Sequence, residues 1–188
     1  MSLEIAIMIA ALNGDTLAPQ ISTSSKYKHW VSVEDLKRCV ICAENHGKIW
    51  LISETPDSNP PIHPNCRCAI EQMQTIKAGT ATIKNKEGAD WKLKYEGMLP
   101  DYYITLKELK ALGWRKGKTI SNVISYKLLT KGVYQNKNGH LPHIPGRIWY
   151  EADINYSSGK RNSQRILWSN DGLIFVTYDH YETFYEIS

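Results

Sequence analysis

The sequence has no long hydrophobic run, which excludes a helix that spans a membrane. Its longest apolar stretch, residues 5–12, contains eight residues, whereas a helix that crosses a bilayer needs about 20. No basic segment precedes this stretch, so we expect no cleaved signal peptide. The sequence therefore predicts cytoplasmic synthesis without a membrane partner, and export or delivery to the cytoplasm of a target cell stays open.

Cysteine is also scarce, and the four cysteines all lie between Cys39 and Cys68. A secreted domain held by disulfides usually spreads its cysteines through the fold. Here the pair Cys39 and Cys42 is followed by the pair Cys66 and Cys68, and tetrahedral zinc takes four thiolates, or three with one imidazole. The sequence predicts a structural zinc on these four cysteines, with His63 as an alternative ligand. Disulfides and free thiols are the two alternatives.

The hydrophobic fraction of the sequence is that of a folded protein, which excludes disorder of the whole chain. They make up 42% of the 188 residues, and charged residues make up 22%, as in ordinary globular proteins. The net charge of +4 is unevenly distributed, because residues 80–188 hold 16 Lys/Arg against 11 Asp/Glu and residues 1–79 hold 7 against 8. A polyanion would bind the positive part, although a solubilising surface explains this charge equally well.

Changes of pattern along the chain divide it into three parts. The apolar stretch and the Ser/Thr-rich run at residues 21–25 indicate a helix or strand followed by a linker. Residues 76–87 have no amphipathic period and are interpreted as a connector. We therefore expect a small Cys/His module over residues 1–75, a linker over 76–87 and a larger domain over 88–188.

The larger domain has a local pattern of one capped helix followed by strands. Thr105 and Glu108 form a capping box, and Gly113 ends the predicted helix over residues 106–112. Strands are predicted over residues 148–156, 165–169, 173–178 and 182–187, with a hairpin turn at 170–172. A helix followed by an antiparallel meander predicts an α+β fold.

The predicted strands bring acid, base and cationic groups to one surface. Cleavage of RNA through its own 2′-hydroxyl needs a base, an acid and cations that stabilise the charged phosphorane. Glu151 and Asp153 share a strand face, Arg161 and Arg165 have the even spacing that aims side chains the same way, and His180 lies at a strand corner. The structural alternative is a solvated glutamate, a surface histidine, and arginines that pair with Asp153.

Two blocks of sequence, residues 99–114 and 146–188, resemble the barnase-type bacterial ribonucleases. The resemblance covers roughly residues 88–188 and implies the microbial ribonuclease fold, an N-terminal helical part packed on a twisted antiparallel sheet. It implies a metal-independent endoribonuclease without a catalytic cofactor, which cleaves single-stranded RNA to a 2′,3′-cyclic phosphate and then hydrolyses it. The implied general base is Glu151 and the general acid is His180. The implied phosphate ligands are Arg161 and Arg165, and Tyr181 matches the aromatic beside the catalytic histidine.

Two positions depart from that family pattern. Leu106 replaces a lysine that faces the active site, and Lys110 lies one turn further along the same helix face. Asn138 replaces the glutamate that reads guanine, so altered base selectivity is expected. The residues expected to bind substrate are Lys110, Tyr134, Asn136, Lys137, Asn138, Asp153 and Tyr181.

The cysteine segment resembles a second family. Cys39-x2-Cys42 and the run from Pro60 to Cys68 are similar to the C-terminal end of phage Mu F-like head morphogenesis proteins. In that family such a segment stands beside exchangeable toxin domains, which implies a toxic effector. A nuclease kept inside its producer implies an acidic, barstar-like immunity protein as partner, besides RNA.

Two other functions are consistent with the residues. One is a non-catalytic, phage-derived structural or nucleic-acid-binding protein, although a degenerate site would have no reason to retain Glu151, Arg161, Arg165 and His180 together. The other is a zinc-dependent hydrolase, although the Cys/His group shows no open coordination position.

Overall fold

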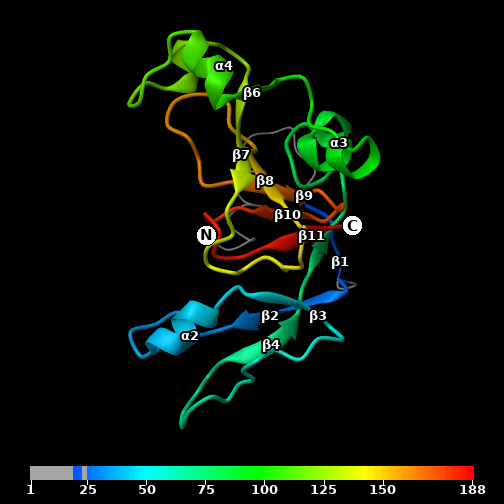
Figure 1. Ribbon diagram of the computed structural model, residues 1–188, viewed down its shortest axis with the longest axis vertical. Helices are drawn as coiled ribbons and strands as arrows, with labels where there is room; N and C mark the ends of the chain where they lie inside the picture. The colour runs from blue at the N-terminus through cyan, green and yellow to red at the C-terminus, as the bar shows by residue number, and fades with distance from the viewer. Residues whose placement is uncertain (1–18, 23–24) are drawn as a thin grey trace.

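The computed structural model describes residues 19–22 and 25–188. The predicted N-terminal helix or strand at residues 5–12 therefore lies outside the described residues. The described part contains two sheets and several short helices (Figure 1), which confirms the α+β class. None of these helices combines the length and the apolar character that crossing a bilayer requires.

The larger sheet has the order β1-β5-β11-β10-β9-β8-β7-β6. Its central strands, β7 to β11, are antiparallel neighbours, and the hairpin at residues 170–172 joins β9 to β10 as predicted. The sheet is nevertheless mixed, because β5 runs parallel to β11 and β6 runs parallel to β7. The strands are β1 (Ile21–Ser22), β5 (Thr75–Ile76), β6 (Tyr103–Thr105), β7 (Leu128–Tyr134), β8 (Trp149–Asp153), β9 (Arg165–Ser169), β10 (Ile174–Thr177) and β11 (Tyr185–Ile187).

Short helices accompany this sheet. Helix α4 (Leu106–Ala111) begins at the predicted capping box, in which Thr105 accepts a hydrogen bond from the Glu108 amide and the Glu108 side chain accepts one from the Thr105 amide. Helix α3 (Ala89–Tyr95) contributes Ala89 and Leu93 to a hydrophobic cluster with residues of β8, β9 and β10. The 3-10 turns are η1 (Asn85–Glu87) and η2 (Ile120–Asn122).

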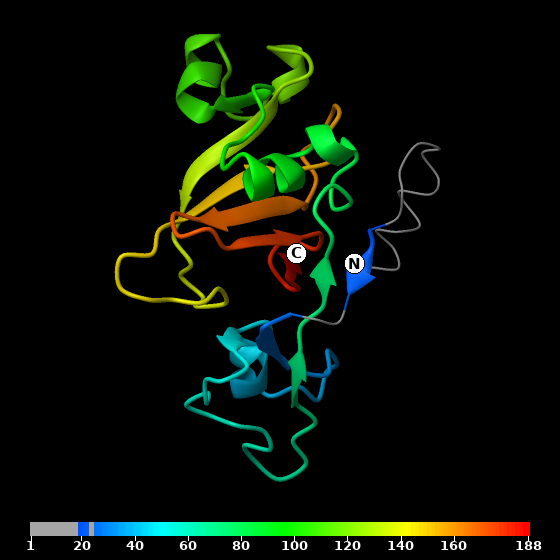
Figure 2. The same cartoon turned by 90° about the vertical axis from the view of Figure 1, so that its right-hand side faces the viewer.

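A smaller sheet of order β3-β2-β4 carries helix α2 (Val40–Asn45) and lies against one end of the larger sheet (Figures 1 and 2). Its strands are β2 (Tyr27–Val31), β3 (Ile49–Leu51) and β4 (Ala69–Gln72). Tyr27, Ile49 and Met73 share a buried cluster with Phe175 and Phe184, and the Tyr27 and Phe175 ring centroids are 5.5 Å apart. One hydrophobic cluster therefore joins the two sheets.

Residues 77–87 follow β5 of the larger sheet and lie within the part of the chain interpreted as a connector, and several of them are packed. Ala78 and Ala81 are buried in the same cluster as α3. The buried Asp90 carboxylate accepts hydrogen bonds from the amides of Gly79 and Ala81 and from the Thr82 hydroxyl. The Ser/Thr-rich run, also interpreted as a linker, begins with strand β1. The domain limits at 75 and 88 stay predictions.

Gly47 marks the close approach of the smaller sheet to the larger one. It has φ +78°, and a Cβ placed there would lie 2.8 Å from the backbone oxygen of Glu182. We expect Gly47→Ala to destabilise the protein by more than the roughly 1–2 kcal/mol that a left-handed alanine costs. Gly97→Ala is the matched control, because Gly97 has φ +73° and no described atom lies within 4 Å of the place its methyl group would take. Urea unfolding should separate the two variants; equal losses would show that the approach to Glu182 carries no strain.

Candidate active site

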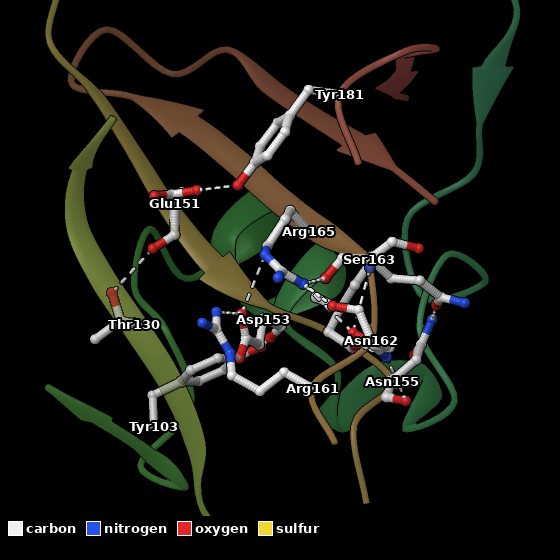
Figure 3. A network of polar contacts seen from close by, with 12 residues as sticks. Tyr103, Thr130, Glu151, Asp153, Asn155, Arg161, Asn162, Ser163, Arg165 and Tyr181 are labelled. Atoms are coloured by element: carbon white, nitrogen blue, oxygen red, sulfur yellow. Dashed lines mark hydrogen bonds and ion pairs between the residues drawn. The ribbon is translucent and has the colours of Figure 1, made fainter. Parts of the chain in front are cut away.

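Glu151 lies in the middle of β8, between β7 and β9, and its residue is only 7% exposed. Its carboxylate accepts a hydrogen bond of 2.5 Å from the Tyr181 hydroxyl, and its backbone oxygen accepts one of 3.1 Å from the Thr130 hydroxyl (Figure 3). Strand β7 has a register shift between Thr130 and Gly132, directly opposite this position. Bulges of this kind re-aim side chains beside functional sites. The sheet thus holds the Glu151 side chain in a fixed position that is largely shielded from solvent.

The turn after β10 presents His180 to solvent. His180 and Tyr181 have backbone φ values of +68° and +76°. Residues other than glycine rarely adopt such values. The turn is closed by Asp179, whose carboxylate accepts hydrogen bonds from the Thr177 hydroxyl and from the amides of Glu182 and Thr183. The Thr177 hydroxyl in turn accepts one from the Tyr181 amide. The sequence indicates a tight corner at Asp179 and His180, but Asp179 was not predicted as a site residue, although an Asp at a turn is the usual signal for such closure.

Tyr181 connects the histidine to the glutamate, and Tyr134 stacks on it. The Tyr181 ring stacks on Tyr134 with centroids 5.4 Å apart, and it lies 4.9 Å from the His180 ring. Burial and the hydrogen bond to Glu151 raise the pKa of Tyr181, so the phenol stays protonated and donates. Burial and the Glu151 charge also raise the pKa of Tyr134. The structure therefore brings Tyr134, Glu151, His180 and Tyr181 together from two separate strands and a turn.

Both predicted arginines meet at Asp153, which is fully buried. Arg161 donates two hydrogen bonds to the Asp153 carboxylate, of 2.7 and 2.5 Å (Figure 3). The Nε of Arg165 lies 3.2 Å from the same carboxylate, and Arg165 also donates to the backbone oxygens of Asn162 and Gln164. The even spacing is not the reason for their proximity, because Arg161 precedes β9 and lies in a loop. The side chain of Arg161 is 32% exposed and that of Arg165 is 4% exposed. Part of the Arg161 guanidinium group is therefore accessible to an anion.

Hydrogen bonds from two asparagines, which were not predicted as site residues, hold the loop that carries Arg161. Asn162 donates to the backbone oxygens of Ile154 and Asn155, and Asn155 donates to the Gln164 side chain. Asn155 has φ +55°, a conformation that asparagine tolerates better than most residues. These amides fix the distance between the end of β8 and the start of β9, and with it the position of both arginines.

The remaining substrate-binding predictions are spread over the surface. Lys137 and Asn138 are exposed after β7, whereas the Asn136 side chain closes its own loop through hydrogen bonds with the backbone of Leu141. Lys110 is exposed on α4. Asp153 was also expected to bind substrate. Its side chain is completely buried behind the two arginines. Its negative charge pairs with both guanidinium groups.

The Cys/His group forms a separate cluster in the smaller sheet module. The Nε2 atom of His63 lies 3.2 Å from the Cys39 sulfur and 3.3 Å from the Cys42 sulfur. The Cys42 and Cys66 sulfurs are 3.9 Å apart, and Cys68 joins these two in a second close group. Backbone amides of Cys68 and Ile62 lower the pKa of Cys66 to about 7. All predicted metal ligands are thus brought together.

A buried carboxylate on the sheet, together with an exposed imidazole and paired guanidinium groups on the sheet and its connecting loops, are the groups that an acid–base phosphodiesterase needs. In a comparison with known proteins, residues 71–188 match the ribonuclease family, and the chain belongs to that family. It is an endoribonuclease. Residues 5–71 match the family of phage Mu protein F like proteins.

Bacterial ribonucleases are among its relatives. The chain is 45% identical over 131 residues to a ribonuclease of Bacillus intermedius, an alignment that covers 66% of this chain and 80% of the relative. It is also 45% identical over 109 residues to a ribonuclease of Heyndrickxia coagulans, covering 57% of this chain and 99% of the relative.

Proposed function

We propose that this endoribonuclease cleaves single-stranded RNA by transesterification to a 2′,3′-cyclic phosphate and then hydrolyses that product, without a catalytic metal. Glu151 acts as the general base toward the 2′-hydroxyl, and His180 acts as the general acid toward the leaving 5′-oxygen. The observation that carries the proposal is the Glu151 carboxylate, buried in β8 and linked through Tyr181 to the turn of His180. A carboxylate that can accept a proton and an imidazole that can donate one suit these two roles.

The arginine pair supplies the positive charge that this reaction needs. Charge accumulates on the phosphate oxygens in the transition state, and fixed donors stabilise it without reorganisation. Arg161 is pre-oriented by its two hydrogen bonds to Asp153 and remains partly exposed. Arg165 is more deeply buried, so it acts mainly through its charge and by holding Asp153. Hydrogen bonding to Asp153 raises the pKa of Arg161, which keeps its charge fixed.

The base of the nucleotide would be bound beside the tyrosine stack. Tyr134 offers a ring face next to Glu151 and Tyr181, and stacking on an aromatic ring tolerates every base. Asn138 can offer only one acceptor group, so we propose cleavage with weak or altered preference for guanine. Lys137 and Lys110 are exposed and would contribute to binding of the RNA backbone.

The two family matches together support a role as a toxin or effector of phage-related origin. The nuclease segment follows a segment that matches phage Mu protein F like proteins. An enzyme of this kind endangers the cell that makes it, so we propose an acidic, barstar-like inhibitor that covers the basic active-site face. We also infer that α3, α4 and the central antiparallel strands form the microbial ribonuclease fold.

The test is product analysis with a labelled single-stranded RNA, with EDTA added together with the substrate. We expect 2′,3′-cyclic phosphate ends that convert slowly to 3′-phosphates. His180→Ala protein, purified in parallel, is the matched control for contaminating nucleases and should give almost no product. Linear ends without a cyclic intermediate would refute the mechanism. Binding of RNA without cleavage would favour the alternative of a nucleic-acid-binding protein.

A further inference from the structure

The Cys/His cluster contains pairs of donor atoms at the spacing of a tetrahedral metal site, in two groups of three that share Cys42. With Zn–S bonds of about 2.3 Å and Zn–N bonds of about 2.0 Å, neighbouring sulfurs lie about 3.8 Å apart and a sulfur and a nitrogen about 3.5 Å apart. The Cys42 and Cys66 sulfurs are 3.9 Å apart, and the two distances from His63 Nε2 to sulfur are 3.2 and 3.3 Å. All four cysteines are free thiols, and 3.9 Å is far longer than the roughly 2.05 Å of a disulfide.

Groups around the cluster orient its donor atoms inward. His63 Nδ1 lies 2.8 Å from the Pro64 backbone oxygen, so this nitrogen carries the proton and Nε2 directs its lone pair at the thiols. A histidine that ligates a metal usually donates its other N–H in this way. The Cys42 amide donates to the Cys39 sulfur at 3.4 Å, and the amides of Ile62 and Cys68 face the Cys66 sulfur. These N–H groups stabilise thiolates, which are the form that binds metal.

The position of the cluster in the fold points to a structural role. Cys39 and Cys42 lie at the start of α2, whereas His63 and Cys66 lie in the long irregular segment between β3 and β4. Long segments without secondary structure are uncommon in compact domains unless something ties them down. This module has few buried side chains of its own, and small modules commonly compensate with a metal or disulfides.

We propose that Cys39, Cys42, His63 and Cys66 bind one structural Zn²⁺ that ties the segment between β3 and β4 to the start of α2. Cys68 lies within 4.8 Å of Cys42 and Cys66 and is the fifth candidate. It is left outside the ligand set because His63 contacts both Cys39 and Cys42 directly. Four protein ligands leave no open position for substrate, which distinguishes this site from a catalytic zinc.

The ligand set is tested by the metal content of full-length chains purified with zinc and without chelators. We expect one zinc per wild-type chain and a substantial loss in Cys39→Ser, His63→Ala and Cys66→Ser. Cys68→Ser is the matched control and should retain one zinc. Wild-type protein without zinc would overturn the proposal. Zinc lost from Cys68→Ser but kept by His63→Ala would overturn this ligand set in favour of four thiolates.

A second measurement needs no variant to fold. Cobalt added to the metal-free wild type should give the absorption of tetrahedral Co²⁺ with thiolate charge-transfer bands. In zinc-loaded protein, mapped alkylation should modify Cys68 and spare Cys39, Cys42 and Cys66. Equal alkylation of all four thiols, or disulfides among them, would contradict the proposal.

Discussion

Replacing Glu151 with glutamine is expected to slow cleavage of single-stranded RNA by roughly 10²–10⁴-fold, the usual contribution of one general acid or base. The amide has nearly the same shape but cannot accept the 2′-hydroxyl proton. The change is measured as kcat/KM on a labelled oligonucleotide. RNA binding should persist, since the substitution adds no negative charge.

Three further variants sharpen this result. His180→Ala should lose a similar factor, and the double variant should be hardly slower than either single one, because residues that act in one step are not additive. Glu182→Gln is the matched control: Glu182 is an exposed carboxylate in the turn after His180, and its loss should leave the rate nearly unchanged. A Glu151→Gln enzyme within a few-fold of wild type would show that the base is another group.

Asp153→Asn is expected to destabilise the protein by roughly 3–5 kcal/mol, the usual cost of breaking a buried ion pair on one side. The reason is that Arg165 would remain, with its side chain 4% exposed and its charge uncompensated. Arg161 would lose one of the two hydrogen bonds that orient it, because the amide nitrogen of asparagine cannot accept, so activity should fall as well. Urea unfolding gives the free energy of unfolding, and the RNA assay gives the rate.

The matched control for this variant is Asp171→Asn. Asp171 also pairs with an arginine, Arg147, but it is 38% exposed, and exposed pairs contribute little because water and salt screen them. We therefore expect a much smaller loss of stability. If both variants lost the same amount, burial of the Asp153 pair would not be the cause, and the assignment of Arg165 as a buried positive charge would be wrong.

The local parts of the fold were predictable from the sequence, whereas the long-range parts were not. The capping box at Thr105 and the hairpin turn at residues 170–172 are signals within a few residues, and both are confirmed. The pairing of β5 with β11 joins Ile76 to Ile187. Two- and three-residue strands carry too little pattern to specify such a partner, because their register is fixed by packing.

The same distinction applies to the active site. The pairing of Arg161 and Arg165 with Asp153 was one of the alternatives that the sequence left open. The stack of Tyr134 on Tyr181 was not visible, because it joins the end of β7 to the turn after β10. Complete burial of Asp153 was also hidden, since a polar strand face normally indicates solvent rather than a buried ion pair.

The contact of Tyr27, Ile49 and Met73 with Phe175 and Phe184 has a consequence for how such chains are assembled and processed. A protease that cut near residue 75 and released the N-terminal segment would expose a seam of aromatic side chains on the rest of the chain. An exposed apolar surface of this kind promotes aggregation or binding to another protein. Exchange of the segment by recombination meets the same constraint. A new N-terminal segment would have to bring apolar side chains that fit this seam.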